Sequence, residues 1–348
     1  MKQLIALFSF FLLISCSSDS GDGGNNGSTT PSNIQIQVTK IGATAALPNG
    51  DGSGDVTITV SATNATDYKI AINGQILNAA NGIFQYSFTS LGTNTYPVVA
   101  SAYNGTNFIS TSVDVTVLVT PTLVWSDEFN TNGAPDSNKW GYDIGAGGWG
   151  NNESQYYTSR PENVIVEGGF LKIKTLRENY LGSPFTSARI KTQDKYSLKY
   201  GRVEMRAKLP AGGGTWPAFW MLGNSIGSLG WPACGEIDIM EHVGNNLNRI
   251  YGTLHHPNHS GGNADGGSVV ISNATTDFHV YATEWTASTI KFYVDDQLYY
   301  TFNNSASLPF NNNFFIILNC AVGGNFGGTI DPNFNASTYE VDYIRVFQ

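Results

Sequence analysis

Apolar and polar residues alternate along most of the chain, the pattern of strands that bury one face. Asn-Gly pairs typical of tight turns fall at 49–52, 73–74, 81–82 and 104–105. Short strands at this spacing predict a small β-sandwich of immunoglobulin-like or PKD-like type over residues 34–120. With no cluster of catalytic side chains there, we expect a spacer rather than a weak carbohydrate-binding module. The clearest alternating runs are Ile34-Ile36-Val38, Val56-Ile58-Val60 and Val113-Val115-Val117-Val119.

The alternation continues over residues 122–348, after Thr120-Pro121 ends the last strand of the first domain. No amphipathic helix of convincing length interrupts it, and a strand-rich stretch of this size still fits one domain. We therefore predict an all-β chain whose second domain stacks two antiparallel sheets as a jelly roll. Its clearest strands are predicted at Phe170–Thr175, Arg202–Leu209, Lys291–Val294 and Tyr339–Phe347.

The first 15 residues predict an export signal. Lys2 precedes an apolar run from Leu4 to Ile14, which is too short to cross a bilayer. The sequence LISC at 13–16 resembles a bacterial lipobox, in which Cys16 carries the lipid of the mature chain. Residues 16–33 have the Gly- and Ser-rich composition of a flexible linker. We expect an exported protein, anchored to the bacterial outer membrane only through this lipid and exposed on the cell surface.

The charge balance limits the classes of partner. Charged residues make up 13% of the 348 residues, about half the usual share, and the net charge is −9. This acidity argues against nucleic acid and against electrostatic docking to acidic lipid. All seven Trp and all five His lie in the second domain, from Trp125 onward. Low charge with many aromatic rings suits a neutral polar ligand, and we expect a monomer.

The most informative segment is 236–241, which reads EIDIME and places three carboxylates within six residues. In a regular strand Glu236 and Asp238 share one face, but Glu241 would point into the core, where an unpaired carboxylate is costly. One β-bulge near Ile239-Met240 returns Glu241 to the face of Glu236. Because like charges this close repel, at least one of the three carboxyl groups should hold a proton at neutral pH.

One ionised and one protonated carboxyl group are what glycoside hydrolysis requires. The neighbouring Trp-rich segments do not have the composition of a solvated acidic surface. Together with WPAFWML at 216–222, the carboxylate segment resembles glycoside hydrolase family 16, and within it the laminarinases, which are endo-β-1,3-glucanases. GWGNNE at 148–153 and AVGGN at 321–325 also match, and the likeness runs from Trp125 to Phe347.

The resemblance implies a concanavalin-like jelly roll over residues 122–348 that hydrolyses laminarin-type β-1,3-glucan with retention of configuration. Met240 favours this branch, since members active on mixed-linkage glucan typically lack the extra residue. A mixed-linkage glucanase, a hydrolase of an algal galactan and a non-catalytic glucan-binding lectin remain alternatives. A sulfated galactan would call for Arg or Lys in the cleft, and a lectin gains nothing from three crowded carboxylates.

The resemblance also assigns roles. Glu236 would be the nucleophile, Glu241 the general acid and then the base, and Asp238 the residue that orients Glu236; no cofactor is expected for catalysis. The resemblance further places three residues in the substrate subsites, namely Asn151, Arg189 and His255. Independently of it, three Trp residues are candidates for stacking on sugar rings, Trp216, Trp220 and Trp231, of which Trp220 is most readily explained as core.

The sequence also leads to predictions about metal sites and thiols. HHPNH at 255–259 invites a zinc interpretation, but it lacks the Glu and the helical spacing of the zinc-protease motif, so we expect a loop with one substrate-facing His. The resemblance implies instead a structural calcium held by Glu128, a carbonyl near Gly168 or Gly169, and Asp342. Cys234 and Cys320 could pair in an exported protein, although two buried free thiols are slightly favoured.

Overall fold

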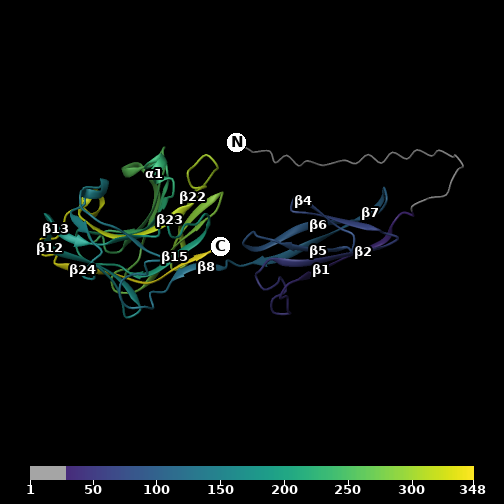
Figure 1. The fold of residues 1–348 in the computed structure, drawn as a ribbon, viewed down its shortest axis with the longest axis horizontal. Coiled ribbons are helices and arrows are strands. Elements are labelled where there is room, and N and C mark those ends of the chain that lie inside the picture. Colours follow the sequence, from purple (N-terminus) through teal and green to yellow (C-terminus); the bar gives the residue numbers. More distant parts are fainter. Residues whose placement is uncertain (1–28) are drawn as a thin grey trace. The chain divides into compact units, whose positions relative to one another are not determined.

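The computed structural model describes residues 29–348, which divide into two compact units between Thr120 and Pro121. Both units are built of strands, and the helical segments have no more than four residues (Figure 1). None of the helices within residues 29–348 has the length and apolar character needed to cross a membrane. The predicted export signal and Cys16 lie outside the described residues. The first strand begins at Ser32, two residues inside the linker predicted for 16–33.

The first unit has two antiparallel sheets. One contains, in order, β1 (Ser32–Lys40), β2 (Asp55–Thr63) and β5 (Ile83–Ser87). The other contains β4 (Gln75–Ala79), β3 (Asp67–Ile72), β6 (Gly92–Asn104) and β7 (Asn107–Val119). Asn73-Gly74 forms a hairpin turn, and Gly105 begins another directly after Asn104, whereas Asn81-Gly82 joins β4 to β5 in the other sheet. The two sheets enclose an apolar core, so the prediction of a sandwich is confirmed, while its immunoglobulin-like type stays a prediction.

The second unit also has two sheets. The larger runs β10 (Gln155–Tyr157), β13 (Ser183–Ser187), β12 (Phe170–Tyr180), β24 (Ala336–Phe347), β15 (Gly201–Lys208), β20 (His279–Trp285), β21 (Thr289–Val294) and β22 (Gln297–Asn303), with β11 (Val164–Glu167) on β12 and β8 (Leu123–Asp127) on β24. The smaller runs β19 (Asp265–Val270), β18 (Arg249–His255), β17 (Glu236–His242), β16 (Thr215–Gly223), β23 (Phe314–Val322), β14 (Arg189–Lys191) and β9 (Gly141–Asp143). Short helical segments lie between strands: η1 (Gly148–Gly150), α1 (Ile226–Leu229), η2 (Gly261–Asn263) and α2 (Gly324–Gly327).

One strand pair departs from the expected topology. β10 and β13 run parallel, so the prediction of two purely antiparallel sheets is wrong at this edge. β11 and β12 lie between them in the sequence and provide the long connection that a parallel pair needs. The predicted alternating segments lie in β12, β15, β21 and β24, apart from Leu209, which follows β15.

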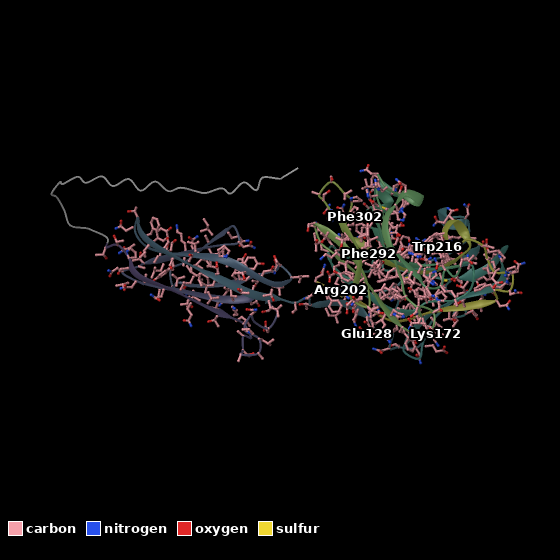
Figure 2. All side chains as sticks on the ribbon, turned by 180° about the vertical axis from the view of Figure 1, so that it is seen from behind. Glu128, Lys172, Arg202, Trp216, Phe292 and Phe302 are labelled. Atoms are coloured by element: carbon pink, nitrogen blue, oxygen red, sulfur yellow. The ribbon has the colours of Figure 1, made fainter. Side chains whose placement is uncertain are left out.

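The core of the second unit lies between its two sheets. Ile237 and Leu254 come from the smaller sheet, Val203 and Phe292 from the larger, and all four have no exposed surface. Figure 2 labels Phe292 within this densely packed unit. Because one face of the smaller sheet is used for the core, its other face is free to present polar side chains.

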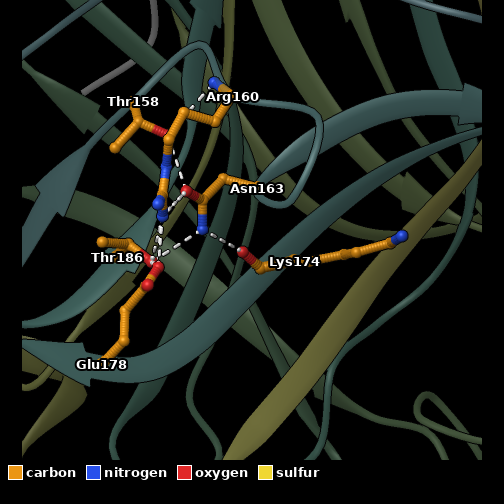
Figure 3. Close-up of polar contacts among 6 residues, drawn as sticks. All are labelled: Thr158, Arg160, Asn163, Lys174, Glu178 and Thr186. Carbon is orange, nitrogen blue, oxygen red and sulfur yellow. Dashed lines mark hydrogen bonds and ion pairs between the residues drawn. The ribbon is translucent and has the colours of Figure 1, made fainter.

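A buried polar network fastens the loop before β11 to β12 and β13 (Figure 3). Asn163 accepts hydrogen bonds from Thr158 Oγ1 at 2.6 Å and Arg160 Nη2 at 2.9 Å, and it donates to Thr186 Oγ1 at 2.9 Å. Arg160 and Thr186 both bind Glu178. Asn163 and Thr186 are fully buried, and their partners offset the penalty of burying polar atoms.

Candidate active site

A bulge in β17 sets the direction of the three carboxylates. Trp220 lies opposite Asp238 and Phe219 opposite Met240, which leaves Ile239 without a partner on β16. On the β18 side, Thr253 pairs with Asp238 and Tyr251 with Glu241, so a single residue faces the pair Ile239-Met240. The bulge predicted at this position is confirmed.

The bulge brings Glu236, Asp238 and Glu241 to one face, where they line a cleft of about 930 Å³. The three apolar residues between them are buried in the core. Gly252 is the residue opposite the bulge, and a Cβ placed there would lie 2.7 Å from the ring of Phe292. The close packing behind the bulge therefore requires a residue without a side chain.

Each carboxylate has a polar neighbour. Glu241 accepts hydrogen bonds from Trp216 Nε1 and from Thr253 Oγ1, both at 3.0 Å. His255 Nε2 lies 3.2 Å from Asp238 Oδ2 and 3.6 Å from Glu236 Oε1. His255, predicted to bind substrate, thus also contacts the carboxylates.

The site favours protonated carboxyl groups. Burial, with the charge of Asp238 second, raises the pKa of Glu236 to about 8. Burial and the charge of Glu241 raise the pKa of Asp238 well above its usual range, and burial raises the pKa of Glu241 against the opposing effect of its two donors. The three groups do not all ionise at neutral pH, as the sequence predicts. Asp238, only 4% exposed, is the group best placed to retain the proton.

The loop after β18 orients His255. The backbone N–H of Gly261 donates to His255 Nδ1 at 3.1 Å. In the neutral ring Nδ1 is then the acceptor, so the ring proton belongs on Nε2, the nitrogen that faces Asp238. His255 can therefore act as a hydrogen-bond donor toward the carboxylates.

All three predicted stacking residues line the cleft. Trp231 is 48% exposed and offers the most open ring surface. Trp216 donates to Glu241, and Figure 2 labels its side chain. Trp220 donates to Asn319 Oδ1 at 2.8 Å and packs on a small apolar cluster beneath the cleft. Trp220 therefore combines a packing contact with a place at the cleft surface.

Arg189 and Asn151 line the same cleft. The guanidinium carbon of Arg189 lies 5.1 Å from the ring centre of Trp149 and 4.7 Å from that of Trp220. Its Nε is 2.9 Å from Asp143 Oδ2, which offsets the charge. Asn151 Nδ2 donates to Glu153 at 3.3 Å.

Sequence reasoning missed several residues that line the cleft, among them Trp149, Glu153 and Thr253. Trp149 and Glu153 belong to the motif at 148–153, so that motif held a usable signal. Thr253 meets Glu241 only because β18 pairs with β17, and no local pattern in the sequence marks it.

Both carboxylates predicted to bind calcium are paired with guanidinium groups, and the calcium site stays a prediction. Both carboxylate oxygens of Glu128 accept from Arg345, at 2.9 Å each, and Asp342 accepts from Arg206 Nη1 at 2.5 Å. Figure 2 labels Glu128. Because calcium needs several oxygen ligands, its binding would require these carboxylates to turn from their guanidinium partners. The N–H of Gly168 donates to Asn132 Oδ1 at 3.0 Å.

The other open predictions are resolved by contacts. Cys234 and Cys320 are both free and buried, which is the alternative that the sequence slightly favoured. Within the 255–259 segment only His255 reaches the carboxylates. His256 and His259 pair instead with Asp265.

Comparison with known proteins agrees with this geometry. The family model for glycosyl hydrolases family 16 matches residues 151–345. A β-glucanase of Rhodothermus marinus is 50% identical over 242 residues, 65% of this chain and 85% of that protein. The X-ray structure of the laminarinase from Rhodothermus marinus matches with 50% identity and a TM-score of 0.63, over 66% of this chain and 98% of that one. The laminarinase catalytic domain from Thermotoga maritima is 42% identical, with a TM-score of 0.62 over 66% of this chain and 98% of that one. The chain belongs to glycosyl hydrolases family 16.

Proposed function

We propose that the chain is an endo-acting, retaining hydrolase of β-1,3-glucan. The observation that carries the proposal is the bulged strand β17, from which Glu236, Asp238 and Glu241 face one cleft. The relatives described as laminarinases and β-glucanase support this substrate class. The cleft also has indole rings for the faces of sugar rings and amide groups for their hydroxyls.

In the first step the ionised carboxylate of Glu236 attacks the anomeric carbon, and the bond from that carbon to the glycosidic oxygen breaks. Glu241 donates its proton to the departing oxygen, so the leaving sugar is released as a neutral alcohol. The product is a covalent ester between the sugar and Glu236. A proton held on Asp238 stabilises negative charge on Glu236 before the attack, as does His255 Nε2–H.

In the second step Glu241 is ionised and takes a proton from water. The resulting hydroxide equivalent attacks the anomeric carbon and releases Glu236 as a carboxylate, so two inversions restore the original configuration. The hydrogen bonds from Trp216 and Thr253 stabilise the ionised form of Glu241 that this step needs. Glu241 is therefore protonated in the first step and ionised in the second, and its two hydrogen-bond donors favour the second state.

The charge of the cleft favours a neutral glucan over a sulfated galactan. Among the described residues that line it, Arg189 is the only Arg or Lys, and Asp143 offsets its charge. A sulfate group would therefore meet three carboxylates without a free cation. The two other alternative substrates, mixed-linkage glucan and neutral galactan, are distinguished by the experiment described next.

The test is release of reducing sugar from laminarin, curdlan, lichenan and agarose by the full chain. We expect rapid release of oligosaccharides from laminarin and slower release from insoluble curdlan, with nothing from agarose. NMR of the first turnovers should show the β-anomer, as retention requires. Absence of release from both laminarin and curdlan would overturn the proposal. Faster release from lichenan than from laminarin would replace it with a mixed-linkage activity.

We also propose that Cys16 carries a lipid anchor that holds the exported protein at the outer membrane. The proposal rests on the LISC sequence and the short apolar run before it. Radiolabelled palmitate should label the full-length protein in its host and should fail to label Cys16→Ala. Labelling that persists in this variant contradicts a lipid on Cys16.

A further inference from the structure

Three metal-ligating side chains meet at the base of the loop between β18 and β19. They are His256, His259 and Asp265, and one ligand atom from each lies within 4.8 Å of the other two. The loop they close also lines the cleft through Gly261, Gly262 and Ala264. The cluster does not contain any of the three catalytic carboxylates.

The cluster is held in place from several sides. Asp265 Oδ2 lies 2.9 Å from His256 Nε2, and Asp265 Oδ1 lies 3.1 Å from His259 Nδ1. The backbones of His256 and His259 exchange two hydrogen bonds, and their rings are nearly parallel with centres 5.4 Å apart. The rings of Phe302 and Phe310 pack on His256, with their centres 6.0 and 5.8 Å from the centre of the imidazole. The two imidazoles and the carboxylate are therefore preorganised around one point.

We propose that His256, His259 and Asp265 form a binding site for a divalent transition metal of the zinc class. Two imidazoles and one carboxylate are typical ligands of Zn²⁺ and leave a fourth position for water. Tetrahedral zinc with bonds of about 2.0–2.2 Å places its ligand atoms about 3.4 Å apart. The two contacts between imidazole and carboxylate, at 2.9 and 3.1 Å, would therefore lengthen only slightly. Calcium and magnesium are disfavoured because they require oxygen ligands, of which the cluster has one carboxylate.

The positions of the imidazole protons on His256 and His259 determine the affinity for the metal. Both imidazoles bind metal in the neutral form, so the ring proton that now faces Asp265 moves to the other nitrogen of each ring. On His259, whose side chain is 47% exposed, that nitrogen can meet water. On His256 the other nitrogen, Nδ1, is buried and has no hydrogen-bond partner among the described residues. Because a metal-bound His normally donates from its second nitrogen, we expect micromolar rather than nanomolar affinity.

The site would act on the cleft through the loop. The hydrogen bond from Gly261 to His255 Nδ1 belongs to the same loop that the metal would close. This consequence rests on the proposed function, whereas metal binding itself does not. The test therefore measures binding directly, and its outcome is independent of whether the enzyme acts on laminarin.

The experiment is titration of the full chain, freed of metal with a chelator, with Co²⁺ followed by visible absorption and with Zn²⁺ followed by calorimetry. We expect one equivalent of each metal, with micromolar affinity and an absorption spectrum of tetrahedral or five-coordinate cobalt. His259→Ala and Asp265→Asn should each weaken binding at least about tenfold. His279→Ala is the matched control, since His279 Nδ1 pairs with Asp295 at 2.6 Å without a second His, and its binding should equal that of the unaltered chain.

A second cluster provides the decisive comparison. Glu236, Asp238 and His255 also present three ligand atoms within reach of one ion. If His255→Asn abolishes binding and His259→Ala does not, the metal occupies the catalytic carboxylates and the proposal is overturned. If the unaltered chain binds neither metal at millimolar concentration, the cluster is only a hydrogen-bonded closure of the loop, which also overturns it. Metal-free melting curves of His259→Ala and His259→Gln verify that each variant is folded.

Discussion

The two units are both sandwiches of alternating strands, but they bury different side chains. In residues 29–120 every buried side chain is apolar or belongs to Gly or Pro. The second unit buries Asp238, Glu241 and the ring of His242. Alternation alone is enough to build a sandwich around an apolar core, as the first unit shows. The chemistry lies where alternation is interrupted, at the bulge of Ile239-Met240.

This difference has an energetic side. The first unit gains from burial without having to desolvate a charge, whereas the second holds carboxyl groups whose pKa values burial raises. A carboxyl group that prefers its neutral form in the fold makes the folded state less stable as the pH rises. The second unit should therefore be the one in which removal of a buried carboxyl group harms activity and improves stability.

The largest expected effect is that of Glu236→Ser on hydrolysis. Loss of the nucleophile prevents formation of the glycosyl ester, so we expect kcat/KM on laminarin to fall at least about 1000-fold. Affinity for laminarin oligosaccharides, measured by calorimetry, should change by only a few-fold because the aromatic lining is intact. Asp55→Asn, in the first unit, is the control and should keep full activity. Normal turnover by Glu236→Ser would refute its assignment as nucleophile.

Asp238→Asn should separate activity from stability. We expect a loss of about 100-fold in kcat/KM because Asn cannot hold and pass the proton. We also expect the free energy of unfolding at pH 7 to rise, because the neutral amide lacks the carboxyl group whose ionisation favours the unfolded chain. The folded pKa of Asp238 is raised above its usual 3.8, so the unaltered chain loses stability as the pH rises above about 4.

The pH dependence checks the sign of that gain. Urea unfolding followed by Trp fluorescence reports on the second unit alone, since the first Trp is Trp125. The difference between Asp238→Asn and the unaltered chain should be small at pH 4 and grow toward pH 7. A difference that grows as the pH falls would mean that Asp238 is ionised and stabilised in the fold, contrary to its burial.

The local part of the site could be predicted from the sequence, because a strand has a strict period and a buried charge has a large free-energy penalty. These two rules place Glu236, Asp238 and Glu241 on one face and require the bulge. The partners of these groups depend on strand pairing over longer distances. Thr253 reaches Glu241 through β18, and Asp265 reaches two His residues through the start of β19.

The same limit applies to the calcium prediction, which stays untested. Glu128 and Asp342 have the right chemistry for a cation, and the resemblance places them together. Whether a carboxylate is open depends on which cations approach it in the folded chain. Here Arg345 and Arg206 come from β24 and β15 and occupy both groups. The parallel pairing of β10 with β13 could likewise not be predicted from local alternation, because the hydrophobic period of a strand does not depend on its direction.

Trp216→Phe should produce a moderate effect that appears in the pH profile. The indole N–H lowers the pKa of Glu241, so its loss raises that pKa. Glu241 must be protonated in the first step, and the descending limb of kcat/KM should therefore move to higher pH. Trp220→Phe is the matched control, because its indole N–H binds Asn319 and its loss should leave the limb in place. Equal shifts in both variants would point to a general change in the cleft.

The smallest effect on activity should come from the core of the first unit. Ile58→Ala removes a fully buried side chain there and should destabilise that unit by about 3 kcal/mol. Calorimetry should show one transition moving to lower temperature, while Trp fluorescence and kcat/KM on soluble laminarin stay unchanged. Ile237→Ala removes an equally buried side chain behind the catalytic carboxylates. It should instead move the fluorescence transition and lower the temperature at which activity is lost. If Ile58→Ala moves both transitions, the two units unfold together, and the first unit contributes to the stability of the second.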